Sequence, residues 1–204
     1  DKRWIENHIR CFDFFDVSIS AGVSISKVGA PVPKHYSFYR WSSQLDTGNV
    51  MFRKEVFYNC GLFDTKFEKM RMGDHEYGMR CHLNGYTIIS NPDSKRIHLK
   101  SKSGGLRVFK HWDGLRSKNI IGPRPIPSIL YLYRKYWGNK SSIYFLLKNI
   151  PFAYSVYSLK GRLLGKLIGL CFFVLFFPLV FLQVLWSWKI SSDLLSKKEE
   201  IEYI

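Results

Sequence analysis

Asp74 is the residue of this 204-residue sequence whose type and position most directly suggest chemistry. It stands at the start of Asp74–Leu83, a segment whose composition predicts a helix that ends at Asn84 and Gly85. At a helix start the unpaired backbone N–H groups and the helix dipole favour an ionised carboxylate, which is the state a general base needs. Two interpretations of Asp74 stay open: a general base, or a helix N-cap with no further role.

Two more charged residues lie on the same predicted helix. Glu76 and Arg80 are four residues apart, a spacing that brings two side chains together on one helix face as an ion pair. Glu76 points away from Asp74, because residues two apart do not share a face. Pairing with Arg80 is enough to explain Glu76 without a catalytic role.

A histidine and a cationic loop follow the next predicted strand. His98 ends an apolar strand, and Lys100, Lys102 and Arg107 come after it around two glycines. Such a loop could close over a phosphorylated leaving group. The competing interpretation of His98, a structural residue at a strand end, is the more common case. The sequence has no H-E-x-x-H, P-loop or G-x-G-x-x-G motif, so metalloprotease, nucleotide triphosphatase and dinucleotide-binding functions lack support.

The elements that must position these residues alternate between strand and helix. Apolar residues alternating with small or polar ones predict strands, and glycines, prolines and Asn-Gly pairs mark the breaks. In chain order we expect a strand at Val17–Ile25, a break at Gly29–Pro33, a strand at Asn49–Arg53, a helix at Lys54–Cys60 closed by Gly61, the helix Asp74–Leu83, and strands Tyr86–Ser90 and Arg96–Leu99 around a turn at Asn91–Asp93. The fold class is therefore α/β.

Composition excludes several classes of protein. With 46% hydrophobic and 23% charged residues the chain has enough apolar material for a core, which excludes intrinsic disorder for most of it. Its cysteines form no C-x-x-C pair, so neither a disulfide framework nor a zinc ribbon is predicted, and a reducing compartment fits best. The chain begins at Asp1 with no basic-then-apolar leader, and we expect it to be a piece of a longer protein without a secretory signal.

One segment, Leu167–Trp188, contains no charged residue. At about 1.5 Å per residue it spans roughly 33 Å, the hydrocarbon thickness of a bilayer. Lys166 and Lys189 flank it, and Pro178 can kink it, which membrane helices tolerate. We expect one transmembrane helix here, and the alternative is a buried core helix.

The basic residues are unevenly spread around this segment. Residues 126–166 contain seven basic and no acidic side chains, and a helical apolar face begins there at Ile126 and runs to Trp137. We expect basic amphipathic helices in the headgroup layer of anionic lipid, and the alternative is that they pack on the globular part. The predicted domains are 1–125, 126–166, 167–188 and a polar tail at 189–204. The positive-inside rule places the globular part in the cytoplasm at the inner (plasma) membrane and the tail across the membrane.

The order of several short motifs resembles the acceptor-side half of glycosyltransferase family 2. Members of that family read roughly G-x-N-x-x-x-R, G-x-F-D, E-D-x-D/E-x-x-x-R and G-Y/F-x-I/L, followed by a strand that ends in His. The matching segments, which together lie within residues 1–110, are Thr47–Arg53, Gly61–Asp64, Gly73–Arg80, Gly85–Ile89 and Arg96–His98. The opening residues Asp1–Glu6 look like the segment that follows the metal-binding D-x-D, so we expect the nucleotide-binding half to lie upstream of Asp1.

The resemblance implies a partial GT-A fold and roles for individual residues. Asp74 matches the family's base, and Glu76, with Arg80, matches the acidic position that supports the acceptor or the motif. Gly48, Asn49 and Arg53 match the donor-side strand. His98 matches a residue near the diphosphate or its metal, and the neighbouring cationic residues would face the diphosphate.

The resemblance also implies a divalent cation, Mn²⁺ or Mg²⁺, whose main ligands would lie upstream of residue 1 and which would act as a Lewis acid on the leaving diphosphate. The sequence departs from the family at Gly73, where members usually carry Glu. One acidic contact of that motif is therefore missing.

The function that follows is a membrane-associated glycosyltransferase. It would transfer a sugar from a nucleotide-diphosphate sugar to a hydroxyl of a lipid-linked or saccharide acceptor, in cell-surface polysaccharide or glycolipid synthesis. Its expected partners are donor, acceptor and membrane lipid, without nucleic acid. Two alternatives stay open: a membrane-tethered basic binding module, which predicts steep salt dependence and indifference to Asp74, and a catalytically inactive relative.

Overall fold

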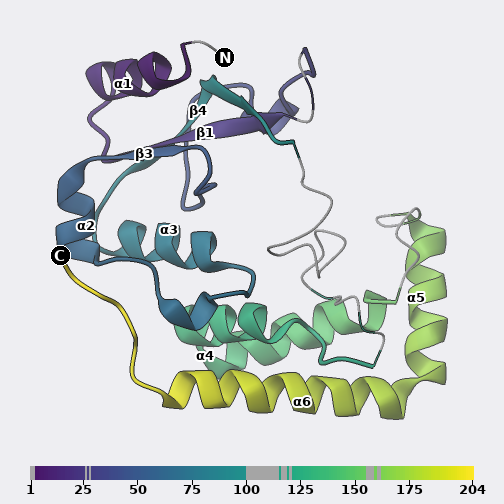
Figure 1. The fold of residues 1–204 in the computed structure, drawn as a ribbon. Coiled ribbons are helices and arrows are strands. Elements are labelled where there is room, and N and C mark those ends of the chain that lie inside the picture. Colours follow the sequence, from purple (N-terminus) through teal and green to yellow (C-terminus); the bar gives the residue numbers. More distant parts are fainter. Residues whose placement is uncertain are drawn as a thin grey trace. The chain divides into compact units, whose positions relative to one another are not determined.

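The computed structural model of the chain describes residues 3–25, 27, 29–99, 115, 119, 121–154, 159 and 162–204 (Figure 1). These residues form two compact units. Unit 1 comprises residues 1–68, 72–102 and 199–204, and unit 2 comprises residues 69–71 and 103–198. The elements in chain order are α1 (Trp4–Phe14), β1 (Ile19–Ile25), η1 (Lys34–Tyr36), β2 (Arg40–Trp41), β3 (Val50–Phe52), α2 (Lys54–Cys60), η2 (Thr65–Phe67), α3 (Gly73–Leu83), β4 (Ile88–Ile97), α4 (Pro127–Asn149), η4 (Ile150–Phe152), α5 (Leu163–Leu175) and α6 (Phe177–Ser196).

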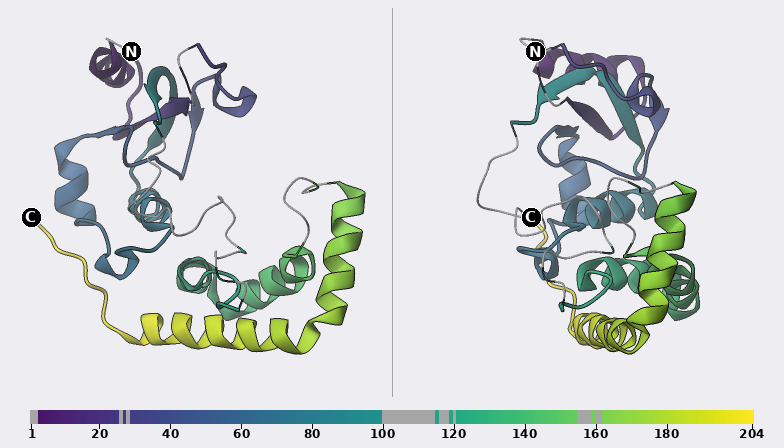
Figure 2. Two further views of the ribbon diagram at one scale, coloured as in Figure 1. Left: turned by 45° about the vertical axis from the view of Figure 1, so that its right-hand side comes forward. Right: turned by 90° about the vertical axis from the view of Figure 1, so that its right-hand side faces the viewer.

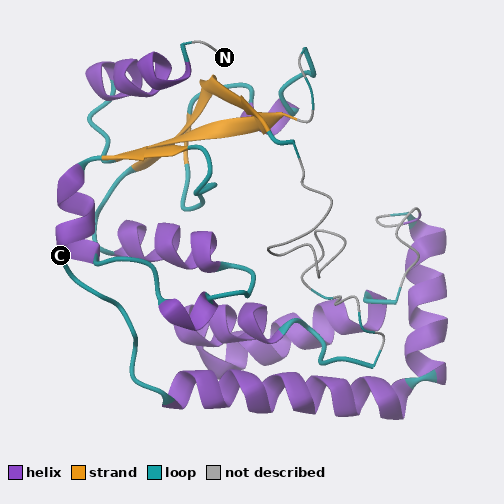
Figure 3. Ribbon diagram, in the orientation of Figure 1, coloured by secondary structure: helices purple, strands orange, loops and turns teal. Residues whose placement is uncertain are grey.

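Unit 1 is built on a mixed four-stranded sheet with the order β2-β4-β1-β3 (Figure 3). The two central strands, β1 and β4, are parallel, and the edge strands β2 and β3 pair antiparallel to their neighbours. The predicted α/β class is therefore confirmed for this unit.

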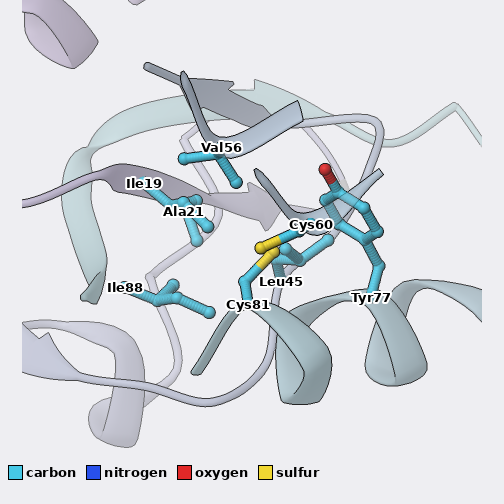
Figure 4. Close-up of a cluster of buried hydrophobic side chains, with 8 residues drawn as sticks. All are labelled: Ile19, Ala21, Leu45, Val56, Cys60, Tyr77, Cys81 and Ile88. Atoms are coloured by element: carbon cyan, nitrogen blue, oxygen red, sulfur yellow. The ribbon is translucent and has the colours of Figure 1, made fainter. Parts of the chain in front are cut away.

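Helices cover both faces of the sheet (Figures 1 and 2). Helix α1 packs on one face, where Cys11, Val17 and Ile89 form a small buried cluster. On the other face, α2 and α3 close the main core, which Figure 4 shows. Its buried members are Ile19, Ala21, Leu45, Val56, Cys60, Tyr77, Cys81 and Ile88. Because both faces are covered, β1 is buried at consecutive positions rather than at alternate ones.

Strand β4 differs from the prediction of two strands around a turn. It runs unbroken from Ile88 to Ile97, and its register against β1 shifts between Gly22, which pairs with Asn91, and Val23, which pairs with Lys95. The extra residues form a bulge, which lets a strand accommodate Pro92. The Oδ1 of Asn91 accepts hydrogen bonds from the backbone N–H groups of Asp93 and Ser94 and so holds the bulge in place.

The predicted helix boundaries in unit 1 hold to within one residue. Helix α2 ends at Gly61, whose φ of 71° lies in the left-handed region and whose N–H bonds to the carbonyl of Phe57. Helix α3 begins at Gly73, one residue before the predicted start. Its close approach to the rest of the unit requires Gly78, because a Cβ there would lie 2.7 Å from the carbonyl oxygen of Ser43.

Unit 2 is helical in its described part. Helix α4 is interrupted at Gly138, whose φ is 74°, so it consists of two helical segments. Residues from both segments pack with α6 in a buried cluster of Leu130, Leu146, Ile150 and Val180. Ser128–Leu132 is buried on every side, so this part of the basic stretch packs within unit 2 itself.

The expectation of one continuous transmembrane helix over Leu167–Trp188 is wrong. The segment forms two helices, α5 and α6, which meet at Phe176 at an angle of 90° (Figures 1 and 2). Pro178 sits in the first turn of α6, where a proline suits a helix start better than a helix interior. Among the described residues, no single helix is long and apolar enough to cross a membrane, whereas α5 and α6 pass that test together.

Candidate functional site

The carboxyl ends of the two parallel strands bring charged residues together in unit 1. Ser24 of β1 and Arg96 of β4 are register partners near these ends. The carboxylate of Asp46, in the loop before β3, joins them: it accepts a 2.6 Å hydrogen bond from the Ser24 hydroxyl and two 2.8 Å hydrogen bonds from the Arg96 guanidinium. The carboxyl edge of parallel strands is where ligands of open α/β sheets bind, so this edge is the candidate site.

Asp46 is held in its ionised form. Burial alone would raise the pKa of its carboxyl, but the hydrogen bond from Ser24 and the adjacent charge of Arg96 outweigh that effect, and the pKa is lowered. The backbone N–H of Gly48 adds a hydrogen bond of 3.1 Å. The cluster thus carries a fixed ion pair of which Arg96 remains 29% and Asp46 41% exposed.

Gly48 lies against this ion pair. A Cβ at position 48 would lie 2.5 Å from the Cζ of Arg96, so the site needs a residue without a side chain there. The family resemblance placed Gly48 on the donor-side strand. In the structure the group that approaches this glycine is the Arg96 guanidinium.

Asn49 is fully buried, and its amide has no capacity left for a ligand. Its Nδ2 donates to the carbonyl oxygens of Val23 and Ser94, at 3.0 and 2.9 Å. Its Oδ1 lies within hydrogen-bonding distance of the Trp4 indole N–H and of the His8 ring Nε2. Asn49 therefore ties α1, β1 and the β4 bulge together behind the site, and we assign it a structural role in place of a donor contact.

Arg53 lies toward the other end of β1. Its Nε donates to the carbonyl of Val17, before the strand starts, and its guanidinium stacks on Phe12. These contacts do not bring Arg53 to the Asp46–Arg96 pair, although the resemblance grouped it with Gly48 and Asn49.

Asp74 does not cap its helix as predicted. The N-cap of α3 is Met72, in the left-handed conformation, and Asp74 lies inside the first turn. Its Oδ1 accepts a 3.0 Å hydrogen bond from the backbone N–H of His75 and lies 3.2 Å from that residue's Nδ1. The Asp74 side chain remains 36% exposed, so its carboxylate can reach a ligand.

The direction of α3 places its first turn toward the candidate site. Only a short connection joins the end of α3 to the start of β4, and α3 runs beneath the sheet in the direction opposite to β1 (Figure 1). The first turn of α3, which contains Asp74, therefore lies at the end of the helix that points the same way as the carboxyl ends of the central strands. Gly73 packs closely against η2, because a Cβ on it would lie 3.2 Å from the Cβ of Phe67.

Glu76 and Arg80 form the predicted ion pair, and it is buried. Their charged groups are 3.0 Å apart, with 0% and 9% of the side chains exposed. Arg80 also donates to the carbonyl oxygens of Cys60 and Leu62. The pair thus joins α3 to the end of α2.

His98 follows β4 directly. Its backbone N–H donates to the carbonyl of Ile25 at 2.9 Å, which extends the pairing of the two parallel strands to the candidate edge. The half-buried side chain of His98 thus belongs to the same edge as Ser24 and Arg96. The cationic residues Lys100, Lys102 and Arg107 lie outside the described residues.

No three His, Cys, Asp or Glu side chains gather into a possible metal site within the described part of the chain. The main ligands of the expected divalent cation would lie upstream of residue 1, and we derive no step through the cation. His98 as a metal ligand and a Mn²⁺ or Mg²⁺ requirement stay predictions.

Sequence reasoning missed the residues that join the strands at this edge. Asp46, Ser24 and Arg96 are far apart in sequence, and only the Asp-x-Gly spacing of Asp46 and Gly48, typical of a turn closed by the aspartate, hinted at a structured loop. Comparison of the chain with family models, with curated proteins and with solved structures gives no match.

Proposed function

We propose that the chain is the acceptor-side part of a membrane-associated glycosyltransferase similar to family 2. The enzyme would transfer a sugar from a nucleotide-diphosphate donor to a hydroxyl of a lipid-linked or saccharide acceptor in cell-surface polysaccharide or glycolipid synthesis. The observation that carries the proposal is Asp74, an accessible carboxylate in the first turn of a helix that begins toward the carboxyl edge of two parallel strands.

In the proposed reaction, Asp74 accepts the proton of the acceptor hydroxyl. The hydroxyl oxygen forms a bond to the anomeric carbon of the sugar, and the bond from that carbon to the diphosphate oxygen breaks. The nucleoside diphosphate leaves with its electron pair. The Asp46–Arg96 pair and the buried amide of Asn49 hold the loop before β3 and the β4 bulge at the site, and Glu76–Arg80 fixes α3.

Membrane attachment, with the globular part in the cytoplasm, is part of the proposal. The support is the exposed apolar surface of α5 and α6 together with the basic residues of 126–166. A membrane-bound site suits an acceptor that carries a lipid chain.

The test uses the natural full-length protein in membranes, with a panel of nucleotide sugars, native lipid extract, and Mg²⁺ or Mn²⁺. The proposal predicts that one donor is consumed and its sugar appears in an acceptor, and that chelating the divalent cation stops the transfer. If no donor is turned over with lipid extract present, the proposal is wrong, and the membrane-tethered binding module takes its place.

A further inference from the structure

The C-terminal tail, residues 199–204, packs on unit 1. The backbone N–H of Leu62 donates to the carbonyl of Glu202 at 2.7 Å, and the Thr65 hydroxyl donates to the Glu200 carboxylate at 2.6 Å. Gly61 allows this approach, because a Cβ on it would lie 2.5 Å from the Cγ2 of Ile201 and 2.9 Å from the carbonyl oxygen of Glu202. The tail is thus an integral part of unit 1.

These contacts constrain how the chain can meet a membrane. Residues 103–198 leave unit 1 and return to it, so both of their ends lie on the side where unit 1 folds. A single crossing would put residues 199–204 on the opposite side and break the tail contacts. A hairpin of two crossings does not fit either: α5 and α6 meet at 90° rather than antiparallel, and the 13 residues of α5 reach only about 20 Å, less than the roughly 30 Å hydrocarbon core.

Helix α6 buries polar residues and exposes apolar ones, which is the opposite of a surface helix in a water-soluble protein. Its buried face carries Gln183, Ser187 and Ser191 beside Val180, and the first two are hydrogen-bonded to Tyr154 and to the carbonyl of Pro125. From Phe177 to Trp186 its outward face is apolar. The exposed large apolar residues of α5 and α6 are Leu163, Leu164, Leu167, Leu170, Phe172, Val174, Leu175, Phe177, Phe181, Leu182, Leu185, Trp186 and Leu195. So many exposed large apolar residues on two successive helices mark a binding or membrane face.

The charges around this surface favour anionic lipid as its partner. The sequence has no acidic residue from 114 to 192. Exposed basic residues lie at the start of α5 (Arg162 and Lys166), in the second half of α6 (Lys189) and on α4 (Lys140 and Lys148). A second copy of the chain would bring the same net charge of +15 to the contact, which disfavours self-association relative to a negatively charged leaflet.

We infer that α5 and the first half of α6 insert into one leaflet of an anionic bilayer, and that residues 199–204 return to unit 1 on the side from which the helices entered. This one-leaflet arrangement replaces the tail across the membrane expected from the sequence. It rests on the membrane attachment in the proposed function but not on sugar transfer.

The side of the tail is tested with cysteines in the full chain. Of the four native cysteines, Cys11, Cys60 and Cys81 are buried and Cys171 is exposed. Cys171→Ser therefore gives a background protein without an exposed cysteine. Into it we place either Ile204→Cys in the tail or Asp13→Cys on α1, both exposed positions. Inverted and right-side-out membrane vesicles from expressing cells are then treated with an impermeant maleimide. The one-leaflet arrangement predicts that both variants label in the same vesicle preparation, and labelling in opposite preparations overturns it.

Insertion is tested by flotation with vesicles of phosphatidylcholine, with and without phosphatidylglycerol. Leu182→Asp places a charge on the outward face of α6, and Leu83→Asp is a matched control at a similarly exposed leucine of unit 1, 62% and 64% exposed respectively. We expect binding that needs the anionic lipid and falls about tenfold or more in Leu182→Asp alone.

Three flotation results would overturn the inference. They are absence of vesicle binding, equal binding by both variants, or unchanged binding combined with dissociation of an oligomer by Leu182→Asp, which would make the face a contact between copies. Neither experiment measures sugar transfer, so failure here is distinguishable from failure of the glycosyltransferase assignment.

Discussion

The guanidinium of Arg96 holds the carboxylate of Asp46 through two hydrogen bonds of 2.8 Å, although the residues are 50 positions apart in sequence. The contact fastens the loop before β3 to the carboxyl end of β4. The backbone of Gly48 packs against the same guanidinium. The loop before β3 and the end of β4 are therefore held together at the candidate site by this ion pair.

Gly22, in the middle of β1, and Gly48, beside the Asp46–Arg96 pair, should respond differently to the same substitution. In Gly22→Ala the new Cβ meets the carbonyl oxygen of Ser94 and the buried Asn49 amide, neither of which can move easily, and we expect a loss of about 1–3 kcal/mol in the free energy of unfolding. In Gly48→Ala it meets the end of the partly exposed Arg96 side chain, which can swing away.

Gly48→Ala should therefore lower the free energy of unfolding less than Gly22→Ala does. It should still reduce transfer activity, because Asp46 loses its ion pair with Arg96. Chemical denaturation and initial rates measure the two effects. Equal destabilisation by the two alanines would contradict this account of the edge.

The buried ion pair of α3 should matter far more than an exposed one. Glu76→Ala leaves the Arg80 guanidinium buried without its carboxylate, and we expect a loss of about 3–5 kcal/mol in the free energy of unfolding. The control is Glu6→Ala on α1, whose pair with Arg10 has the same i, i+4 spacing but is about half exposed. There we expect at most about 0.5 kcal/mol. Similar losses in denaturation experiments on the two variants would refute the structural role of Glu76.

His8 should make unit 1 sensitive to mild acid. The side chain is fully buried, with Ser20 and Asn49 as hydrogen-bond partners. Burial lowers the pKa of His8 below its ordinary 6.5, and the hydrogen bond with Asn49 only partly opposes this. The unfolded chain then binds the proton more readily than the folded one, so stability is full above about pH 6.5 and falls as the pH drops toward the folded pKa.

The measurement is the denaturation midpoint between about pH 5 and pH 7.5, compared with His8→Gln. We expect the wild-type midpoint to fall more steeply with acid than that of the variant. Parallel curves would show that His8 does not titrate differently in the folded and unfolded chains.

Local sequence signals predicted β1, β3, α2 and α3 of unit 1, but helix α1 (Trp4–Phe14) was not predicted. Gly61 marked the end of α2, and the i, i+4 spacing of Glu76 and Arg80 identified a helix face. The course of β4 also escaped prediction, because it depends on contacts between distant residues. Pro92 looked like the end of a strand, but Asn91 and the buried Asn49 stabilise a bulge that carries β4 past it.

The apolar segment illustrates the same limit in unit 2. The hydropathy of Leu167–Trp188 does not distinguish one continuous helix from two shorter helices that meet at an angle. The break at Phe176 is set by Pro178 and by the packing of one α6 face on α4, which buries Val180 and Gln183. Likewise, Asp74 looked like an N-cap because helix propensity alone does not reveal that Met72 adopts the left-handed conformation before α3.

The most direct test of the central claim is the rate of sugar transfer by Asp74→Asn in the natural full-length protein, measured in membranes with the donor that the wild type consumes. The control is Asp13→Asn, which removes an exposed carboxylate from α1. If Asp74 is the base, the rate falls by about 10²-fold or more while donor binding and the denaturation midpoint are kept, and the control matches the wild type. A rate for Asp74→Asn equal to that of the control would contradict the assignment of Asp74 as the base.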